Sequence, residues 1–173
     1  MKKTLLFLVV LCFSVTANAQ LFKSSKKKAN EQTKLWRYET ICSGVGVQGT
    51  VLLKVYSYSK KPRISKEQSK KNAVHAVIFK GFVGGNGCRS QKSLARGNAI
   101  EIENKVYFDT FFADGGDYLR YVNLTNDGRV AAGDVQKVSR REYKVGVVVS
   151  VNKADLRKRL ERDGIIKSLS HGF

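Results

Sequence analysis

The stretch of sequence that decides the fold is residues 142–151, Glu-Tyr-Lys-Val-Gly-Val-Val-Val-Ser-Val. Its β-branched side chains favour extended backbone, because two heavy atoms on Cβ restrict the side chain more in a helix than in a strand. The run is nearly continuous in apolar residues, as in strands that are buried on both faces. We therefore expect residues 142–151 to form a central strand of a β-sheet.

Upstream segments show the two-residue period of further strands. Trp36, Tyr38 and Cys42 alternate with polar residues, and residues 50–58 are rich in Val, Leu and Tyr. The short glycine-rich link at 44–49 predicts that these two strands form an antiparallel hairpin. Residues 118–124 also alternate, residues 129–138 are a weaker strand candidate, and residues 126–128 mark a turn between them.

Residues 65–80 predict an amphipathic helix that begins at a capping box formed by Ser65 and Gln68 and ends at Gly81. Its apolar stripe leaves a basic outer face. That face consists of Lys66, Lys70 and Lys71.

Two more helices are expected, at residues 100–113 and 152–161. In the last one Asn152 is the N-cap and Asp155 is the third helical residue, with Leu156 and Leu160 facing inward. Strands and helices do not alternate strictly, which favours an α+β fold. We expect a small, mostly antiparallel sheet of about four to five strands, with about three helices packed mainly on one face.

The N-terminus has the pattern of a cleavable signal peptide. Lys2 and Lys3 precede a mostly apolar run at residues 5–15, and Ala17-Asn18-Ala19 predicts cleavage before Gln20. The run is shorter than the roughly 20 residues of a membrane-spanning helix. A lipoprotein signal cut at Cys12 is the alternative, but Leu11 stands where a small residue is expected. We predict a signal peptide at 1–19, a flexible basic arm at 20–34 and one domain at 35–173.

After signal cleavage two cysteines remain, Cys42 and Cys88. An oxidising compartment favours a disulfide between them, and two separate buried thiols are the alternative. Cys88 lies in the glycine-rich stretch 81–98, which we expect to be a long irregular loop.

The chain has a net charge of +18, which falls to about +16 when Lys2 and Lys3 leave with the signal. Such a charge favours anionic partners, and a merely solvating basic surface is the alternative. Candidate binding residues are the basic positions on the two best helices and in the glycine-rich loop. They are Lys66, Lys70, Lys71, Arg89, Arg157, Lys158 and Arg162.

The sequence contains no catalytic or cofactor-binding motif in the structural setting that such a motif needs. Residues 44–49 match the dinucleotide pattern G-x-G-x-x-G, but a strand follows where that motif needs a helix. There is no nucleophile elbow and no H-E-x-x-H pair, and His75 lies beside an apolar stripe, as a packed or surface histidine would. The two histidines are far in sequence from the cysteines, so zinc has few ligands. We expect no enzymatic activity, no cofactor and no metal.

Three segments, at residues 70–78, 116–122 and 142–151, together with Leu156 and Leu160, resemble the N-terminal domain of the flagellar assembly protein T family and related small outer-membrane lipoproteins. They are more distantly similar to the periplasmic domain of curli-export lipoproteins. The resemblance implies a small sheet with helices on one face and an envelope role in assembly or scaffolding. The glycine-rich insert, the strong basicity and the lack of a convincing lipobox depart from that pattern, so a flagellar role is not carried over.

These observations lead to one expectation with one alternative. We expect an exported, non-enzymatic binding or scaffold protein that is periplasmic or associated with the outer membrane, or that is secreted. The alternative is a secreted basic module that binds an anionic polymer, namely a glycan, lipopolysaccharide or nucleic acid.

Overall fold

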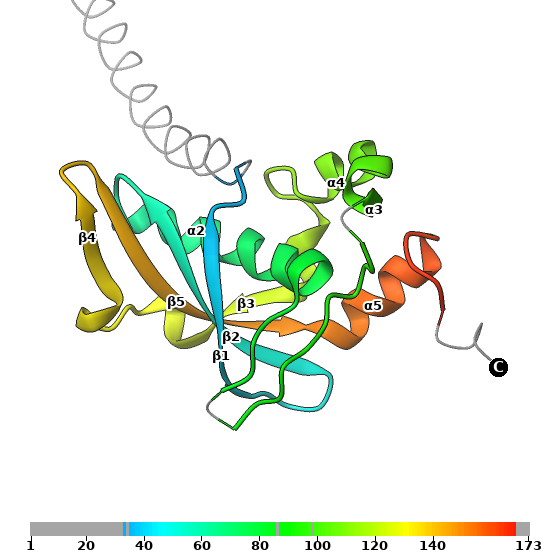
Figure 1. Cartoon of the computed structure of the whole chain (residues 1–173), viewed down its shortest axis with the longest axis horizontal. Helices are drawn as coiled ribbons and strands as arrows, with labels where there is room; N and C mark the ends of the chain where they lie inside the picture. The colour runs from blue at the N-terminus through cyan, green and yellow to red at the C-terminus, as the bar shows by residue number, and fades with distance from the viewer. Residues whose placement is uncertain (1–32, 34, 86, 98, 169–173) are drawn as a thin grey trace, which may run out of the picture.

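The computed structural model describes residue 33 and residues 35–85, 87–97 and 99–168 (Figure 1). The predicted signal peptide lies outside the described residues, and so does the predicted basic arm apart from Thr33. Within the described part of the chain, no helix is long and apolar enough to cross a membrane.

The fold is α+β, as expected, with one five-stranded sheet whose named strand pairs are all antiparallel. The strands are β1 (Tyr38–Val45), β2 (Thr50–Ser59), β3 (Val122–Leu124), β4 (Val135–Ser139) and β5 (Glu142–Asn152). The sheet order is β1-β2-β5-β3, and β4 also pairs with β5. The hairpin predicted from residues 44–49 is the β1–β2 pair.

The prediction of a central strand at 142–151 is confirmed by β5. One edge of β5 pairs with the whole of β2, from Thr50 opposite Asn152 to Ser59 opposite Tyr143. Its other edge is divided between β3, near Val151, and β4, near Val145. Every other residue of β5 from Val145 to Val151 is fully buried, so one face of this central strand forms part of the hydrophobic core.

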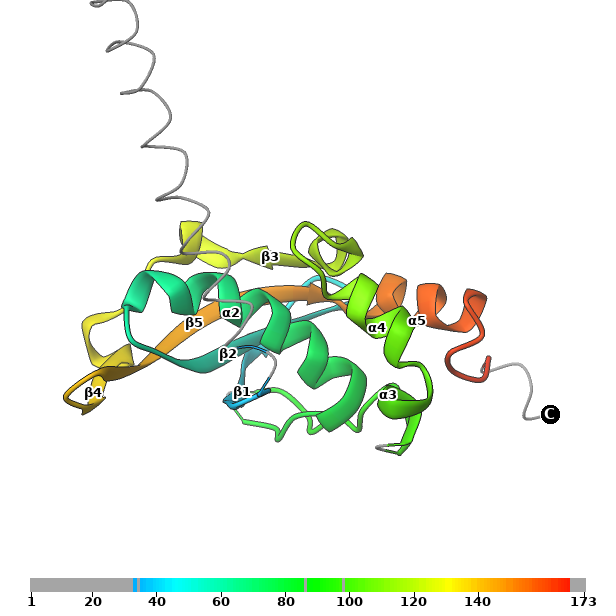
Figure 2. The same ribbon diagram turned by 90° about the horizontal axis from the view of Figure 1, so that it is seen from above.

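One helix covers that buried face (Figure 2). Helix α2 (Pro62–His75) continues into a π-helical turn, η1 (Ala76–Lys80), and the segment ends at Gly81, which has a φ of 71°. The predicted capping box is wrong, because α2 begins earlier, at Pro62. Ser65 is therefore buried inside the helix. Proline suits the first helical position because its missing N–H would have no partner there.

The predicted helix at 100–113 is two short helices, α3 (Ala99–Glu103) and α4 (Lys105–Phe111), which meet at Asn104. The strand predicted at 118–124 is mostly wrong. Residues Asp117–Tyr121 form a 3₁₀ helix, η2, and only β3 is extended. Tyr118 and Tyr121 are both buried, and a 3₁₀ turn places residues three apart on the same side.

The chain between β3 and β5 is less extended than the sequence predicts. It contains two 3₁₀ turns, η3 (Thr125–Gly128) and η4 (Ala132–Asp134), and within it only β4 forms a strand. The predicted turn at 126–128 lies in η3, where Asn126 and Asp127 have φ values of 49° and 54°.

The C-terminal helix α5 (Lys153–Arg162) follows its prediction closely. The Asn152 side chain accepts a hydrogen bond from the backbone N–H of Asp155 at 3.1 Å. Leu156 and Leu160 are fully buried. In Figures 1 and 2, α5 lies at the opposite end of the molecule from β4.

The predicted disulfide is present between Cys42 and Cys88, with Cα atoms 6.3 Å apart. The irregular stretch after Gly81 is folded back on itself by bridges from Phe82 to Gln91 and from Gly85 to Cys88. A third bridge joins Val83 to Ile41, at the edge of β1. The disulfide therefore fastens this stretch to the β1 edge of the sheet.

Replacing both Cys42 and Cys88 with serine should lower the free energy of unfolding by about 3–4 kcal/mol, because the cross-link closes a long loop of the unfolded chain. Urea unfolding under oxidising conditions measures this loss. Reductant should destabilise the wild type by a similar amount and leave the double variant unchanged. Equal stability of the two proteins under oxidising conditions would contradict the stabilising role of the bridge.

Candidate functional site

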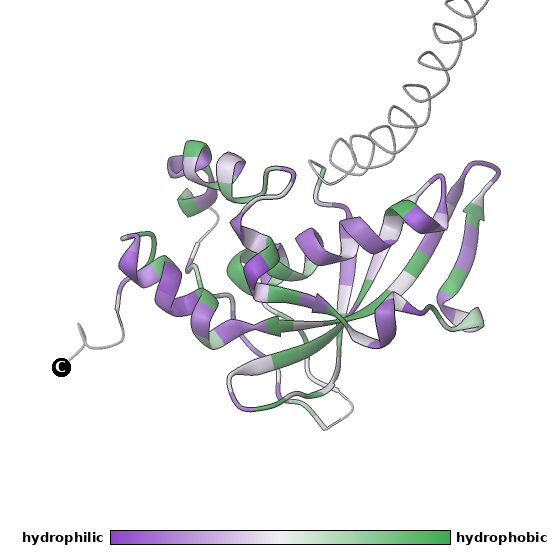
Figure 3. Cartoon of the chain, turned by 180° about the vertical axis from the view of Figure 1, so that it is seen from behind, coloured by the Kyte–Doolittle hydropathy of each residue, from purple (hydrophilic) through white to green (hydrophobic). Residues whose placement is uncertain are grey.

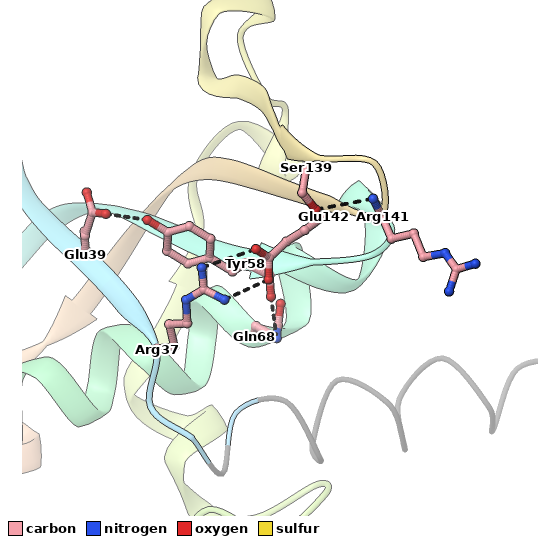
Figure 4. A network of polar contacts seen from close by, with 7 residues as sticks. All are labelled: Arg37, Glu39, Tyr58, Gln68, Ser139, Arg141 and Glu142. Atoms are coloured by element: carbon pink, nitrogen blue, oxygen red, sulfur yellow. Dashed lines mark hydrogen bonds and ion pairs between the residues drawn. The ribbon is translucent and has the colours of Figure 1, made fainter.

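The sheet face turned away from α2 carries a network of charges that satisfy one another (Figure 4). The Arg37 guanidinium donates two hydrogen bonds to the Glu142 carboxylate, at 2.8 and 3.2 Å, and lies 4.2 Å from the ring centroid of Tyr58. The Tyr58 hydroxyl donates to Glu39 at 2.5 Å, and the Lys144 ammonium donates to the same carboxylate at 2.6 Å. These two hydrogen bonds lower the pKa of Glu39.

The same arrangement recurs further along this face. Lys54 forms an ion pair with Asp134 at 2.9 Å, and the Tyr56 hydroxyl donates to that carboxylate at 3.1 Å. The Tyr56 ring lies over Gly146 so closely that a Cβ there would be 2.7 Å from it. The three cations of this face, Arg37, Lys54 and Lys144, thus each have a carboxylate partner. We interpret the network as structural, because it leaves little charge for a ligand.

His75 lies in a second polar cluster, at the junction of α2 and η1. Its Nδ1 atom is 2.6 Å from the Tyr38 hydroxyl, and its Nε2 atom is 3.2 Å from a carboxylate oxygen of Glu101. The Trp36 ring stacks on the imidazole with 3.7 Å between centroids. Burial, assisted by the charge of Lys80, lowers the pKa of His75 to about 3.

The imidazole of His75 is consequently neutral at pH 7. A carboxylate can only accept, so Nε2–H donates to Glu101 and Nδ1 accepts from the Tyr38 hydroxyl. Both ring nitrogens are occupied and the side chain is 3% exposed. Tyrosine, histidine and carboxylate are the components of a proton relay, but this one is closed to a substrate. Of the packed and surface roles that the sequence left open for His75, the structure shows the packed one.

The candidate binding residues on α2 do not form the exposed basic face that the sequence predicts. Lys70 forms an ion pair with Glu67 at 3.3 Å. Lys71 is only 5% exposed, and its ammonium lies 5.4 Å from the ring centroid of Tyr118, so its prediction as a surface contact is wrong. The reason is that α2 begins one turn early and packs against η2 as well as against the sheet. Burial lowers the pKa of Lys71. Lys66 is half-buried.

The candidate cations on α5 are paired within their own helix or its last turn. Arg157 binds Glu161 at 2.9 Å, Lys158 binds Asp155 at 3.3 Å, and Arg162 lies 3.6 Å from Asp163. Arg89 is exposed in the stretch fastened by the disulfide. The seven predicted residues therefore stay separate candidates and do not meet on one surface.

The structure brings together five other exposed cations, which the sequence analysis did not select. We call them the basic end; they are Lys60, Lys61, Arg63, Arg140 and Arg141. The first three follow β2 and open α2, whereas the last two form the turn between β4 and β5. The two segments meet because Ser59 pairs with Tyr143. Figures 1 and 2 show both turns at one end of the molecule, and Figure 3 shows both as hydrophilic.

Four members of the basic end, Lys60, Lys61, Arg140 and Arg141, have no ion pair with any carboxylate of the described residues. The backbone N–H of Arg141 donates to Ser139 Oγ at 3.4 Å, inside the turn (Figure 4). Each half of the basic end is a short basic stretch of the sequence, Lys-Lys-Pro-Arg at 60–63 and Ser-Arg-Arg-Glu at 139–142. Only the strand register joins them.

Metal binding has no evident site in the part of the chain that the structure describes. No group of three or more His, Cys, Asp or Glu side chains is placed there to hold an ion.

Comparisons with family models, with curated proteins and with solved structures find no match to this chain. The resemblance to the flagellar assembly protein T family therefore stays a prediction.

The low pKa of His75 predicts that acid destabilises the protein before its carboxylates titrate. Below pH 6.5 the unfolded chain binds a proton that the folded chain does not accept until about pH 3. The free energy of unfolding should thus fall by up to about 1.4 kcal/mol per pH unit as the pH drops below 6.5. Urea unfolding at pH 7.5 and pH 5.0 should show a loss of about 2 kcal/mol.

The control for this prediction is the second histidine. A His171→Gln variant should keep the loss between pH 7.5 and pH 5.0, whereas His75→Gln should remove most of it. An NMR titration of the wild-type His75 ring gives a test that does not depend on the variants. Titration of that ring with a midpoint near 6.5 would contradict the account.

Proposed function

We propose that this chain is an exported, non-enzymatic binding protein of the cell envelope, and that it holds an anionic partner at its basic end. The observation that carries the proposal is the contrast between two sets of cations. Arg37, Lys54 and Lys144 on the open sheet face and Arg157, Lys158 and Arg162 on α5 have carboxylate partners. Lys60, Lys61, Arg140 and Arg141 have none among the described residues.

Unpaired charge at a surface is worth more to a ligand than paired charge. A cation that already has a carboxylate partner must lose that contact or share it, so the net gain on binding an anion is small. Exposed cations without such partners attract anions over a Debye length and raise the rate of association. Two loops that present such cations side by side form a contact surface suited to several anionic groups at once.

Two observations support an oxidising location. The Cys42–Cys88 bridge is of a kind that persists outside the cytoplasm, and residues 1–19 have the pattern of an export signal. We propose a periplasmic or outer-membrane-associated protein. The resemblance to the flagellar assembly protein T family implies a role in assembly or scaffolding. Such a role agrees with a protein that binds its partner and catalyses no reaction.

A matched pair of triple variants tests the proposal. In the first variant Lys60, Arg140 and Arg141 become glutamine, and in the second Arg157, Lys158 and Arg162 become glutamine, so both lower the net charge by the same amount. The probe is a heparin oligosaccharide of fixed length, titrated by calorimetry at several salt concentrations. The first variant should bind at least tenfold more weakly, with a salt dependence reduced by about two to three released ions.

The second variant should bind heparin within about threefold of the wild type, because its cations are engaged with Asp155, Glu161 and Asp163. Equal losses in the two variants would mean that net charge alone drives binding. In that case the basic end would not be the site, and the proposal would fail.

A further inference from the structure

Strand β4 is an open edge of the sheet. It pairs with β5 on one side, and its other side forms no backbone hydrogen bond with any described residue. All five residues, Val135–Ser139, are exposed. Alternate N–H and C=O groups of an edge strand point outward, so β4 presents a row of unpaired donors and acceptors. Such a row is a template for one more strand.

The β1 edge is treated differently. There the stretch after Gly81 lies against the strand, with Val83 bridged to Ile41 and Cys88 bonded to Cys42. A covalently fastened cover of this kind protects an edge from pairing with other chains. The fold thus fastens a segment to the β1 edge at Ile41 and Cys42 and leaves the β4 edge free among the described residues.

Charge decides what kind of strand β4 can accept. Lys137 lies on β4, and Arg140 and Arg141 of the basic end follow it directly. The neighbouring acids are already engaged, since Glu142 binds Arg37 and Asp134 binds Lys54. A second copy of this chain would bring the same cations to the edge. Like charges facing each other across a strand pair are unfavourable, whereas carboxylates there would be attracted.

We infer that β4 is a docking strand for an extended acidic segment of a partner protein, which adds to the sheet beyond β4. The inference rests on the proposed function and names its partner. Backbone hydrogen bonds to β4 would supply the pairing, and carboxylates of the partner would meet Lys137, Arg140 and Arg141. The length of β4 suits a partner segment of about five residues.

Hydrogen exchange measured by NMR on the full mature chain tests the inference. The probe is an eight-residue peptide that alternates glutamate with valine. The control is the same peptide with every backbone nitrogen methylated, which keeps the charge but removes the donors from both edges. The unmodified peptide should slow the exchange of alternate amides within residues 135–139 at least tenfold. The methylated peptide should bind at least tenfold more weakly and protect none of them.

Two charge-reversal variants complete the experiment. Lys137→Glu should weaken binding of the unmodified peptide at least tenfold, whereas Lys167→Glu, an exposed lysine beyond α5, should change it less than threefold. Equal binding of the two peptides without amide protection, or no peptide binding, would overturn the inference. If heparin binding still depended on the basic end, the proposed function would stand and the partner would be an anionic polymer held by side chains alone.

Discussion

The pairing of β5 along both of its edges is the constraint on which the rest of the structure depends. Its full-length register with β2 sets Ser59 opposite Tyr143, and through that one pair the turn after β2 meets the turn before β5. Its other edge is too long for β3 alone, which leaves room for β4 at the far end. The alternate valines of β5 face α2 and hold the helix over the same strands. A one-residue slip of β5 would turn those valines to the other face of the sheet, away from α2.

The net charge of the chain is a poor guide to where it binds. Many of its cations are structural: Arg37 and Lys144 brace the open sheet face, and Lys71 is buried beside Tyr118. What matters for an anionic partner is the charge that the fold leaves without a counter-charge, and four such cations, Lys60, Lys61, Arg140 and Arg141, meet at the basic end. The proposed binding function follows from that distribution. The open β4 edge beside the basic end suits an extended acidic segment of a partner protein.

Local sequence patterns predicted the features that depend on local chemistry. The valine run of β5, the β1–β2 hairpin, the Asn152 cap and the Cys42–Cys88 pair all follow from residues near one another or from residue type. The failures have a common cause, which is tertiary packing. Tyr118 and Tyr121 look like part of an alternating strand, but both are drawn into the core by a 3₁₀ turn. The basic end needs a strand register between residues more than eighty positions apart, which no local pattern contains.

The central claim is that the unpaired cations which the fold brings together at the basic end are the ones that hold the partner. The most direct measurement is a map of backbone amide chemical shifts during titration with a heparin oligosaccharide. The account predicts that the largest changes fall at residues 60–63 and 137–142, with residues 153–162 nearly unmoved. Largest changes on α5, or on α2 around Lys66 and Lys70, would contradict it.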